Sequence, residues 1–165
     1  PEVAMEIGAY CGYTAVRMAS IMPAGSKLIS VELDPLYAAI ATKVVEHAGL
    51  SDRVHVEIGT LADRLPAIQR KHGLSGPLGV VLLDHNVSSY LPDLQLLEGN
   101  GHINKSTVVL CDWSLYPGSD AASAGAPTDG EEFMKYLNEI GVSQSKTTKR
   151  NGKEVFTVSA SDWWV

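Results

Sequence analysis

The sequence has no long apolar run and no cluster of basic residues. No uninterrupted apolar stretch approaches the roughly 20 residues that a membrane-spanning helix needs, and no signal peptide is visible. Lysine and arginine number 13 against 19 aspartates and glutamates, so the formal net charge is −6. This charge argues against a surface that follows nucleic-acid phosphates or anionic lipids. We therefore expect a cytoplasmic chain that binds neither nucleic acid nor a membrane.

Cysteine is scarce, since Cys11 and Cys111 are the only two. They lack the spacing of a disulfide framework, so we expect reduced thiols, as in a cytosol-like compartment. Internal repeats and low-complexity linkers are also missing, and 165 residues with 45% hydrophobic composition suit one well-covered core. We predict a single domain over residues 1–165. The sequence opens at Pro1 rather than at a methionine, so targeting residues upstream stay an open alternative.

What the sequence does contain is an alternation of short apolar runs and amphipathic stretches, which is typical of a parallel sheet covered by helices. The expected parallel strands are Val3–Ile7, Lys27–Glu32, Val54–Ile58, Gly79–Asp84 and Thr107–Asp112. Two more strands, Gln144–Lys149 and Glu154–Ser159, flank an Asn-Gly pair that indicates a hairpin turn. We therefore expect the last pair of strands to be antiparallel.

Capping and turn residues mark helices between these strands. Asp34 before Pro35 is typical of an N-cap followed by a first-turn proline, and Gly49 suits a left-handed helix end. The remaining signals are Thr60 and Asp63 before a helix that Gly73 ends, and a capping-box spacing at Thr128–Glu131.

A glycine-containing segment follows the first expected strand and precedes a helix-like pattern. In Glu6-x-Gly8-x-x-x-Gly12 the glycines suit a tight turn and a backbone that lies close to a ligand. The paired Gly-x-Gly that seats a dinucleotide pyrophosphate is missing, which disfavours NAD. Glu32 ends the second strand, where an acid can bind both ribose hydroxyls. Alone, each feature is also explained as an ordinary turn or a helix cap. Together they favour a nucleoside-containing cofactor.

The glycine loop combined with Glu32 resembles the S-adenosylmethionine-binding motif of class I methyltransferases, and the segment Glu6–Ala19 is very similar to the corresponding stretch of the catechol O-methyltransferase family. Further similarity covers Val80–His85, Tyr90–Asp93, Val108–Asp112 and Pro117–Gly118, and we interpret 90–93 and 117–118 as loops. The resemblance implies a Rossmann-like, doubly wound α/β fold with a seven-stranded, mostly parallel sheet whose last strand is antiparallel. The family has helices before the first strand, so we expect this domain to lack its N-terminal helices, which upstream residues or another subunit would replace.

The resemblance also implies the cofactor, S-adenosylmethionine, and its neighbours. Its methionine and ribose portions would face Glu6, Gly8, Tyr10 and Thr14, and Glu32 would bind the ribose hydroxyls. The rest of the cofactor-binding set is Leu33, which would pack on the adenine, with Gly59, Asp84 and His85 around it. An ordinary loop histidine is the other interpretation of His85. The polar pair that the family carries shortly after Gly59 is here Leu61-Ala62, so this loop loses those contacts to adenine.

The catalytic end departs from the family pattern. The family holds Mg²⁺ with an Asp after the fourth strand and an Asp-Asn pair after the fifth. Both aspartates are present, as Asp84 and Asp112, but Trp113 replaces the asparagine, and an indole cannot ligate a cation. The family's general-base lysine corresponds to Val87. We therefore expect Mg²⁺ to bind weakly at most, and the candidates for the base are His85, Tyr90 and Tyr116.

Two functional hypotheses stay open. The leading one is an S-adenosylmethionine-dependent O-methyltransferase of the catechol type, acting on a small aromatic hydroxyl substrate. The alternative is a degenerate methyltransferase domain that serves as a cofactor-binding or structural module in a larger assembly. The paired Trp163-Trp164 would be an exposed anchor there, although core packing explains them equally well. The remaining histidines are expected to be solvated: His47, His55, His72 and His102.

Overall fold

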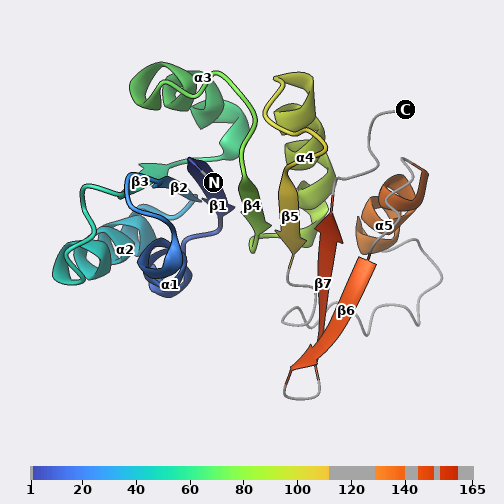
Figure 1. Ribbon diagram of the computed structural model, residues 1–165, viewed down its shortest axis with the longest axis horizontal. Coiled ribbons are helices and arrows are strands. Elements are labelled where there is room, and N and C mark those ends of the chain that lie inside the picture. The colour runs from blue at the N-terminus through green and yellow to red at the C-terminus, as the bar shows by residue number, and fades with distance from the viewer. Residues whose placement is uncertain (1, 112–128, 140–144, 151–152, 160–165) are drawn as a thin grey trace.

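The computed structural model describes residues 2–111, 129–139, 145–150 and 153–159 (Figure 1). The strands are β1 (Val3–Ile7), β2 (Lys27–Glu32), β3 (Val54–Ile58), β4 (Val80–Leu83), β5 (Val108–Cys111), β6 (Ser145–Arg150) and β7 (Lys153–Ser159). The helices are α1 (Tyr13–Ile21), α2 (Pro35–His47), α3 (Leu61–His72), α4 (Tyr90–Gly99) and α5 (Asp129–Glu139), and a short 3-10 helix, η1 (Val87–Ser89), precedes α4.

The strands of the described residues form one seven-stranded sheet in the order β3-β2-β1-β4-β5-β7-β6. Strands β1 to β5 are parallel, and β7 runs antiparallel to both β5 and β6. This confirms the predicted α/β sheet and its antiparallel hairpin. Strands β1, β2 and β3 have the predicted bounds, whereas β4 is shorter and leaves Gly79 and Asp84 in the flanking loops. Strand β5 excludes Thr107, and the predicted strand ends Asp112 and Gln144 lie outside the described residues.

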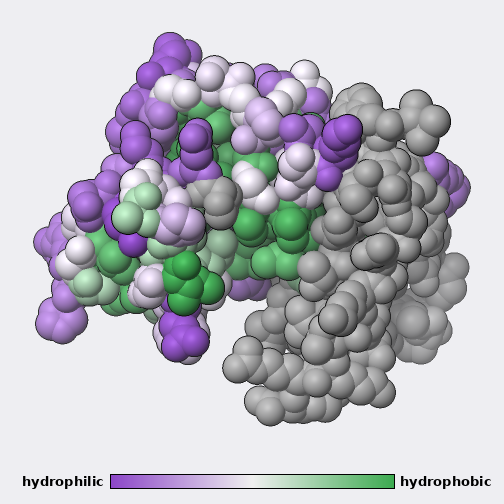
Figure 2. All heavy atoms as spheres, viewed as in Figure 1, coloured by the Kyte–Doolittle hydropathy of each residue, from purple (hydrophilic) through white to green (hydrophobic). Residues whose placement is uncertain are grey.

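One face of the sheet is covered by α1 and α2. Its buried cluster is built from small and branched side chains: Ala4, Ala15, Ala19, Leu28, Val45 and Val54. Apolar side chains also stay exposed on the outer surface of these two helices (Figure 2); Ile21 is 85%, Tyr13 71% and Leu36 65% exposed. Scattered apolar residues are normal on a protein surface. The alanine-rich inner face is what packs α1 and α2 against the sheet.

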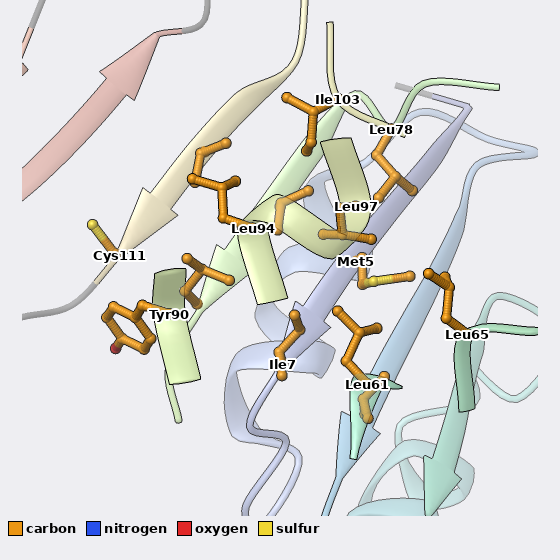
Figure 3. Packing of buried hydrophobic residues seen from close by; sticks show 14 of the residues in the cluster. Met5, Ile7, Leu61, Leu65, Leu78, Tyr90, Leu94, Leu97, Ile103 and Cys111 are labelled. Carbon is orange, nitrogen blue, oxygen red and sulfur yellow. The ribbon is translucent and has the colours of Figure 1, made fainter. Parts of the chain in front are cut away.

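The opposite face carries the larger core, which is covered by α3, α4 and α5 (Figure 3). Met5 and Ile7 point to this face while Ala4 points to the other, because successive side chains of a strand alternate. The other residues labelled in this cluster are Leu61, Leu65, Leu78, Tyr90, Leu94, Leu97, Ile103 and Cys111. Helices on both faces make the sheet doubly wound, as predicted.

The predicted helix ends are found where the sequence placed them. The Asp34 side chain accepts hydrogen bonds from the backbone N–H groups of Leu36 and Tyr37, and Thr60 caps α3 by accepting from the N–H of Asp63. Gly49 and Gly73 have positive φ angles of 70° and 66° at the ends of α2 and α3. The capping box at Thr128 lies outside the described residues.

The segment Tyr90–Asp93 is the first turn of α4, so its interpretation as a loop was wrong. Pro92 is the third residue of this helix. A proline at the third helical position is tolerated because the N–H groups of a first turn have no partner within the helix. Tyr90 is fully buried at the start of this helix, beside the β5 end of the core (Figure 3).

Two histidines are not solvated, contrary to expectation. His102 is 1% exposed, donates from Nδ1 to the carbonyl of Gly76 and accepts at Nε2 from Gln69. The His72 side chain is 7% exposed and lies 2.8 Å from a carboxylate oxygen of Glu57. These contacts are tertiary, so the spacing of histidines along the sequence does not reveal them.

Cys111 is buried and Cys11 half-buried, and no disulfide joins them. Within the described residues, no helix combines the length and the apolarity that crossing a membrane requires.

Candidate cofactor and active site

A cleft of about 630 Å³ opens at the carboxyl ends of β1, β2, β3 and β4. It lies where the strand order reverses, because β2 and β4 flank β1 on opposite sides. In open α/β sheets, ligands bind in the crevice at this switch point. The lining residues come from four loops: Ile7, Gly8, Tyr10, Val31, Glu32, Leu33, Asp34, Tyr37, Gly59, Thr60, Leu61, Asp84, His85, Asn86, Ser89 and Asp93.

The glycine loop is shaped by close packing against its neighbours. Gly8 has a φ of +103°, and a Cβ atom there would lie 2.2 Å from the carbonyl oxygen of Asp84. Gly12 has a φ of +80°, and its Cβ would lie 2.9 Å from the Cα of Ala41 in α2. Both glycines are therefore needed for the loop to fit between β4 and α2. The sequence had suggested close approach to a ligand, and the structure adds close approach of the backbone to itself.

Tyr10 is a strained residue of the same loop, with a φ of +46° that non-glycine residues rarely adopt. Its backbone N–H donates to Glu32 Oε2 at 2.7 Å, and its ring lies 4.5 Å, centre to centre, from that of Tyr37. The strain is thus balanced by a charge-assisted hydrogen bond and a ring contact.

Glu32 stands at the end of β2, in the cleft wall. Besides Tyr10, its carboxylate accepts a hydrogen bond from the N–H of Asp34 at Oε1, over 2.9 Å. A carboxylate has about four lone-pair positions, so two backbone donors leave room for two more. Leu33, 68% exposed, lies beside it in the same wall, with Gly59 at the end of β3.

Glu6 lies behind the loop rather than in the cleft wall. It is 0% exposed, and its Oε2 accepts a hydrogen bond from Ser30 on β2. The pKa of Glu6 is raised to about 7, chiefly by burial; the hydrogen bond from Ser30 opposes this rise, and the charges of Asp84 and Glu32 add to it. Oε1 has no hydrogen-bond partner among the described residues. Thr14, predicted in the same group, is half-buried in the first turn of α1 and does not line the cleft.

His85 and Asp93 form a pair on the β4 side of the cleft, with His85 Nε2 2.9 Å from Asp93 Oδ2. The two side chains are 16% and 14% exposed. The Tyr90 ring packs against the imidazole at 5.1 Å, and the Phe133 ring of α5 packs edge-on against Tyr90 at 5.6 Å. His85 Nδ1 is buried and has no hydrogen-bond partner within the described part of the chain. The segment Tyr90–Asp93 thus fixes the position of His85.

The predicted catalytic positions divide into three groups. Asp84 and His85 line the cleft. Val87, at the family's base position, begins η1 and packs partly buried against the large core, and Tyr90 lies within that core. The third group lies outside the described residues: Asp112, Trp113 and Tyr116. The described residues contain no group of three or more His, Cys, Asp or Glu side chains placed to hold a metal.

Several lining residues were not singled out as cofactor-binding from the sequence. They are Asp34, Tyr37, Thr60, Leu61, Asn86, Ser89 and Asp93. Asp93 had a signal, because it belongs to the matched segment Tyr90–Asp93, and Asn86 and Ser89 lie between two matched segments. For Tyr37 the sequence has no signal, since its place depends on the angle at which α2 leaves β2.

Solved structures of similar fold include the O-methyltransferase from Bacillus cereus in complex with SAH, with a TM-score of 0.73 and 18% identity. The match covers 96% of this chain and 74% of that one. TomG from Streptomyces achromogenes, an O-methyltransferase in complex with SAM, matches with a TM-score of 0.72 and 20% identity over 95% of this chain and 71% of that one. At these identities the likeness establishes the fold.

Sequence relatives point to the same group of proteins. Catechol O-methyltransferase of Bos taurus is 45% identical over 119 residues, 72% of this chain and 43% of the bovine protein. That of Mus musculus is 44% identical over 147 residues, covering 85% and 55%. The transmembrane O-methyltransferase of Homo sapiens is 38% identical over 142 residues, covering 86% and 45%. The chain spans about half the length of these relatives. Residues 2–139 match the O-methyltransferase family. The chain therefore belongs to that family.

Proposed function

We propose that this chain binds S-adenosylmethionine in the cleft and transfers its methyl group to a hydroxyl of a small aromatic molecule. The observation that carries the proposal is the placement of Glu32, whose carboxylate is held in the cleft wall by the N–H groups of Tyr10 and Asp34. Its remaining lone pairs suit a pair of ribose hydroxyls. Membership of the O-methyltransferase family and similarity to catechol O-methyltransferases support the reaction class. Scarce cysteine and a net charge of −6 support a cytoplasmic location.

The remaining cofactor contacts follow from the same wall. Leu33 offers an exposed apolar face for the adenine, and Gly59 and His85 line the cleft around it. Behind the glycine loop, Glu6 supplies a buried carboxyl whose Oε1 lacks a partner among the described residues. Because bound S-adenosylmethionine carries positive charge, the carboxyl groups of Glu32 and Asp84 in the cleft wall and of Glu6 behind it suit this cofactor better than they suit the diphosphate of NAD.

S-adenosylmethionine brings the electrophilic methyl group, so the protein has to align the acceptor oxygen and remove its proton. Alignment supplies up to roughly 7–11 kcal/mol in favourable cases, and a general base about 10²- to 10⁴-fold in rate. Val87 cannot accept a proton. Of the candidate bases within the described residues, His85 lines the cleft and Tyr90 does not. While Nε2 is paired with Asp93, His85 can accept a proton only at Nδ1. We therefore propose slow turnover, with His85 or Tyr116 as base.

Magnesium fits this chain poorly. Asp84 lines the cleft, Asp112 is the second carboxylate that the sequence supplies, and Trp113 stands where the family has an oxygen ligand. Because Mg²⁺ often retains several waters and uses one or two carboxylates, we propose weak binding by Asp84 and Asp112. No step of the proposed reaction depends on it.

The first test compares ligands. Calorimetry with S-adenosylmethionine, its demethylated product S-adenosylhomocysteine and NAD should give tight binding of the first two and weaker binding of NAD. Incubation with methyl-labelled S-adenosylmethionine and a panel of catechols and phenols, with and without Mg²⁺, should give slow labelling of an aromatic hydroxyl. NAD binding as tight as that of S-adenosylmethionine, or no labelled product with any acceptor, would overturn the proposal.

The second test restores the family's catalytic groups. Trp113→Asn and Val87→Lys together should raise catechol turnover and Mg²⁺ affinity more than the sum of their separate effects, because metal and base act on the same hydroxyl. The matched control is Val44→Lys, which adds the same charge at an exposed position of α2. If the unaltered chain already turns over catechol with Mg²⁺ at about 1 per second or faster, our interpretation of Val87 and Trp113 is wrong.

A further inference from the structure

A serine lies between apolar, buried residues in the middle of strand β2. Ser30 is 0% exposed, and its neighbours along β2, Ile29 and Val31, belong to the large core. Burying a hydroxyl costs free energy unless it is hydrogen-bonded. The bond that the structure gives Ser30 runs from its Oγ to Glu6 Oε2.

Strand register accounts for this contact. Strands β1 and β2 are parallel neighbours, and their register places Glu6 opposite Ser30. Because Met5 and Ile29 face the large core, alternation directs Glu6 and Ser30 to the face covered by α1. The pair therefore lies beneath the start of the glycine loop. The two residues that follow Glu6, Ile7 and Gly8, line the cleft.

The pair is incomplete as it stands. Oε2 of Glu6 is satisfied by Ser30, whereas Oε1 is buried and has no hydrogen-bond partner among the described residues. The charged groups that act on Glu6 are Asp84 at the end of β4 and Glu32 at the end of β2, and both are acidic. A buried carboxylate beside two others is stabilised by a cation or a hydrogen-bond donor, and a ligand bound in the cleft can bring one.

We propose that Ser30 is a positioning residue of the cofactor site, which holds Glu6 by one oxygen and reserves the other for the positively charged methionine portion of the cofactor. This inference rests on the proposed function. Ser30 does not line the cleft and acts through Glu6 alone. Without its hydroxyl, both oxygens of the carboxyl would be unpartnered. The pKa of Glu6 is about 7 with the hydrogen bond from Ser30 in place, and because that bond lowers it, loss of the hydroxyl would raise the pKa and favour the protonated carboxyl at neutral pH.

The experiment measures affinities of two probes by calorimetry: S-adenosylhomocysteine, which has the ammonium group, and 5′-methylthioadenosine, which lacks the amino-acid portion. Ser30→Ala should weaken S-adenosylhomocysteine about tenfold and leave 5′-methylthioadenosine within about twofold. Ser30→Thr should restore the affinity, because it keeps the hydroxyl. Ser20→Ala is the matched control, since that serine is exposed on α1 and bonds only to the carbonyl of Val16.

A double-mutant cycle separates positioning from packing. If Ser30 acts through Glu6, Ser30→Ala should have little further effect on S-adenosylhomocysteine affinity in a Glu6→Gln background. Equal weakening of both probes, or additive losses in the cycle, would show a merely structural serine and overturn the inference. If the unaltered chain binds neither probe, the proposed function fails instead.

Should Ser30→Ala fail to fold, the unaltered chain still decides the matter. With a pKa of about 7 for Glu6 in the free protein, affinity for S-adenosylhomocysteine should fall roughly tenfold between pH 7.5 and pH 6, while that for 5′-methylthioadenosine stays level. Parallel pH profiles for the two probes would contradict the inference.

Discussion

The two sides of the cleft use their polar groups differently. On the side of β1 and β2, Glu32 accepts two backbone hydrogen bonds and Glu6 one from Ser30, and each carboxylate keeps lone pairs for a ligand. On the side of β4, His85 Nε2 is paired with Asp93, and the imidazole packs against the ring of Tyr90. The first side is organised to receive a ligand, and the second is largely occupied by its own contacts.

This difference separates binding from chemistry. A preorganised wall saves a ligand the cost of ordering it, so cofactor affinity depends on the β1 and β2 side. We propose that the proton transfer depends on the β4 side, where Val87 packs partly buried against the large core. Substitutions on the β1 and β2 side should therefore change cofactor affinity, whereas those on the β4 side should leave it nearly unchanged.

The largest expected effect is that of Gly8→Ala, which disturbs the contact between the glycine loop after β1 and the backbone of Asp84 after β4. The new Cβ would meet the Asp84 carbonyl oxygen at 2.2 Å, at a φ of +103°. Left-handed strain of about 1–2 kcal/mol and overpacking of about 1–3 kcal/mol should lower the free energy of unfolding by about 3 kcal/mol. Urea denaturation measures it. Gly25→Ala is the control: Gly25 has a φ of +85°, but a Cβ there would meet no atom of the described residues within 4 Å, so this variant should show only the strain. Equal losses in both variants would show that the contact with Asp84 does not matter.

Glu32→Ala should have the next largest effect, on the binding side alone. Loss of hydrogen bonds to a charged group should cost about 1–3 kcal/mol of S-adenosylmethionine binding free energy. Calorimetry measures this loss, with Glu46→Ala as the control, since Glu46 is an exposed glutamate of α2 that pairs only with Lys43. Unchanged affinity in Glu32→Ala would refute the assignment of the ribose site.

Asp93→Ala tests the β4 side, where Asp93 pairs with His85. Breaking the half-buried pair with His85 should destabilise the fold by about 1–2 kcal/mol but change S-adenosylhomocysteine affinity less than threefold. Thermal unfolding and calorimetry on the same sample give both values. Asp52→Ala, at an exposed turn before β3, is the control. A larger loss of affinity than of stability would mean that the β4 side also organises the cofactor.

The last expected effect lies far from both sides, at Glu57 on the edge strand β3, and concerns the pH dependence of stability. Burial alone would raise the pKa of this carboxyl, but hydrogen bonds from Lys71, His72 and Arg64 outweigh it and lower the pKa from 4.5 to about 2. A carboxyl with a depressed pKa stabilises the fold fully above pH 4.5, and this contribution is lost as the pH falls towards 2. In Glu57→Gln, the dependence of unfolding free energy on pH should flatten in that window. An unchanged slope would show that other carboxyls dominate.

The sequence predicted the strands well because their identity is local. Val3–Ile7, Lys27–Glu32 and Val54–Ile58 are short apolar runs between turn residues, and burial on both faces leaves little choice of bounds. Residues of the cleft wall were also predictable where a motif contained them, as with Gly8 and Glu32.

What the sequence did not reveal depends on partners that are distant along the chain. The burial of His102 requires Gln69 and Gly76, and the link between Ser30 and Glu6 requires the register of β1 with β2. The helix beginning at Tyr90 was missed because residues 90–93 were interpreted as a loop, although the first turn of a helix tolerates the proline at position 92.

The central place of β1 has a consequence for synthesis of the chain on the ribosome. Strand β1 pairs with β2 and with β4, and about seventy residues separate it from β4. At roughly 5–20 residues per second, one edge of β1 waits about 4–15 s for its partner to be translated. During that time its apolar sequence, Val-Ala-Met-Glu-Ile, offers an unpaired strand edge to other nascent chains. Glu6, the charged residue of that strand, would then oppose mispairing, because an unpaired strand edge that carries a charge is a poorer partner for another chain.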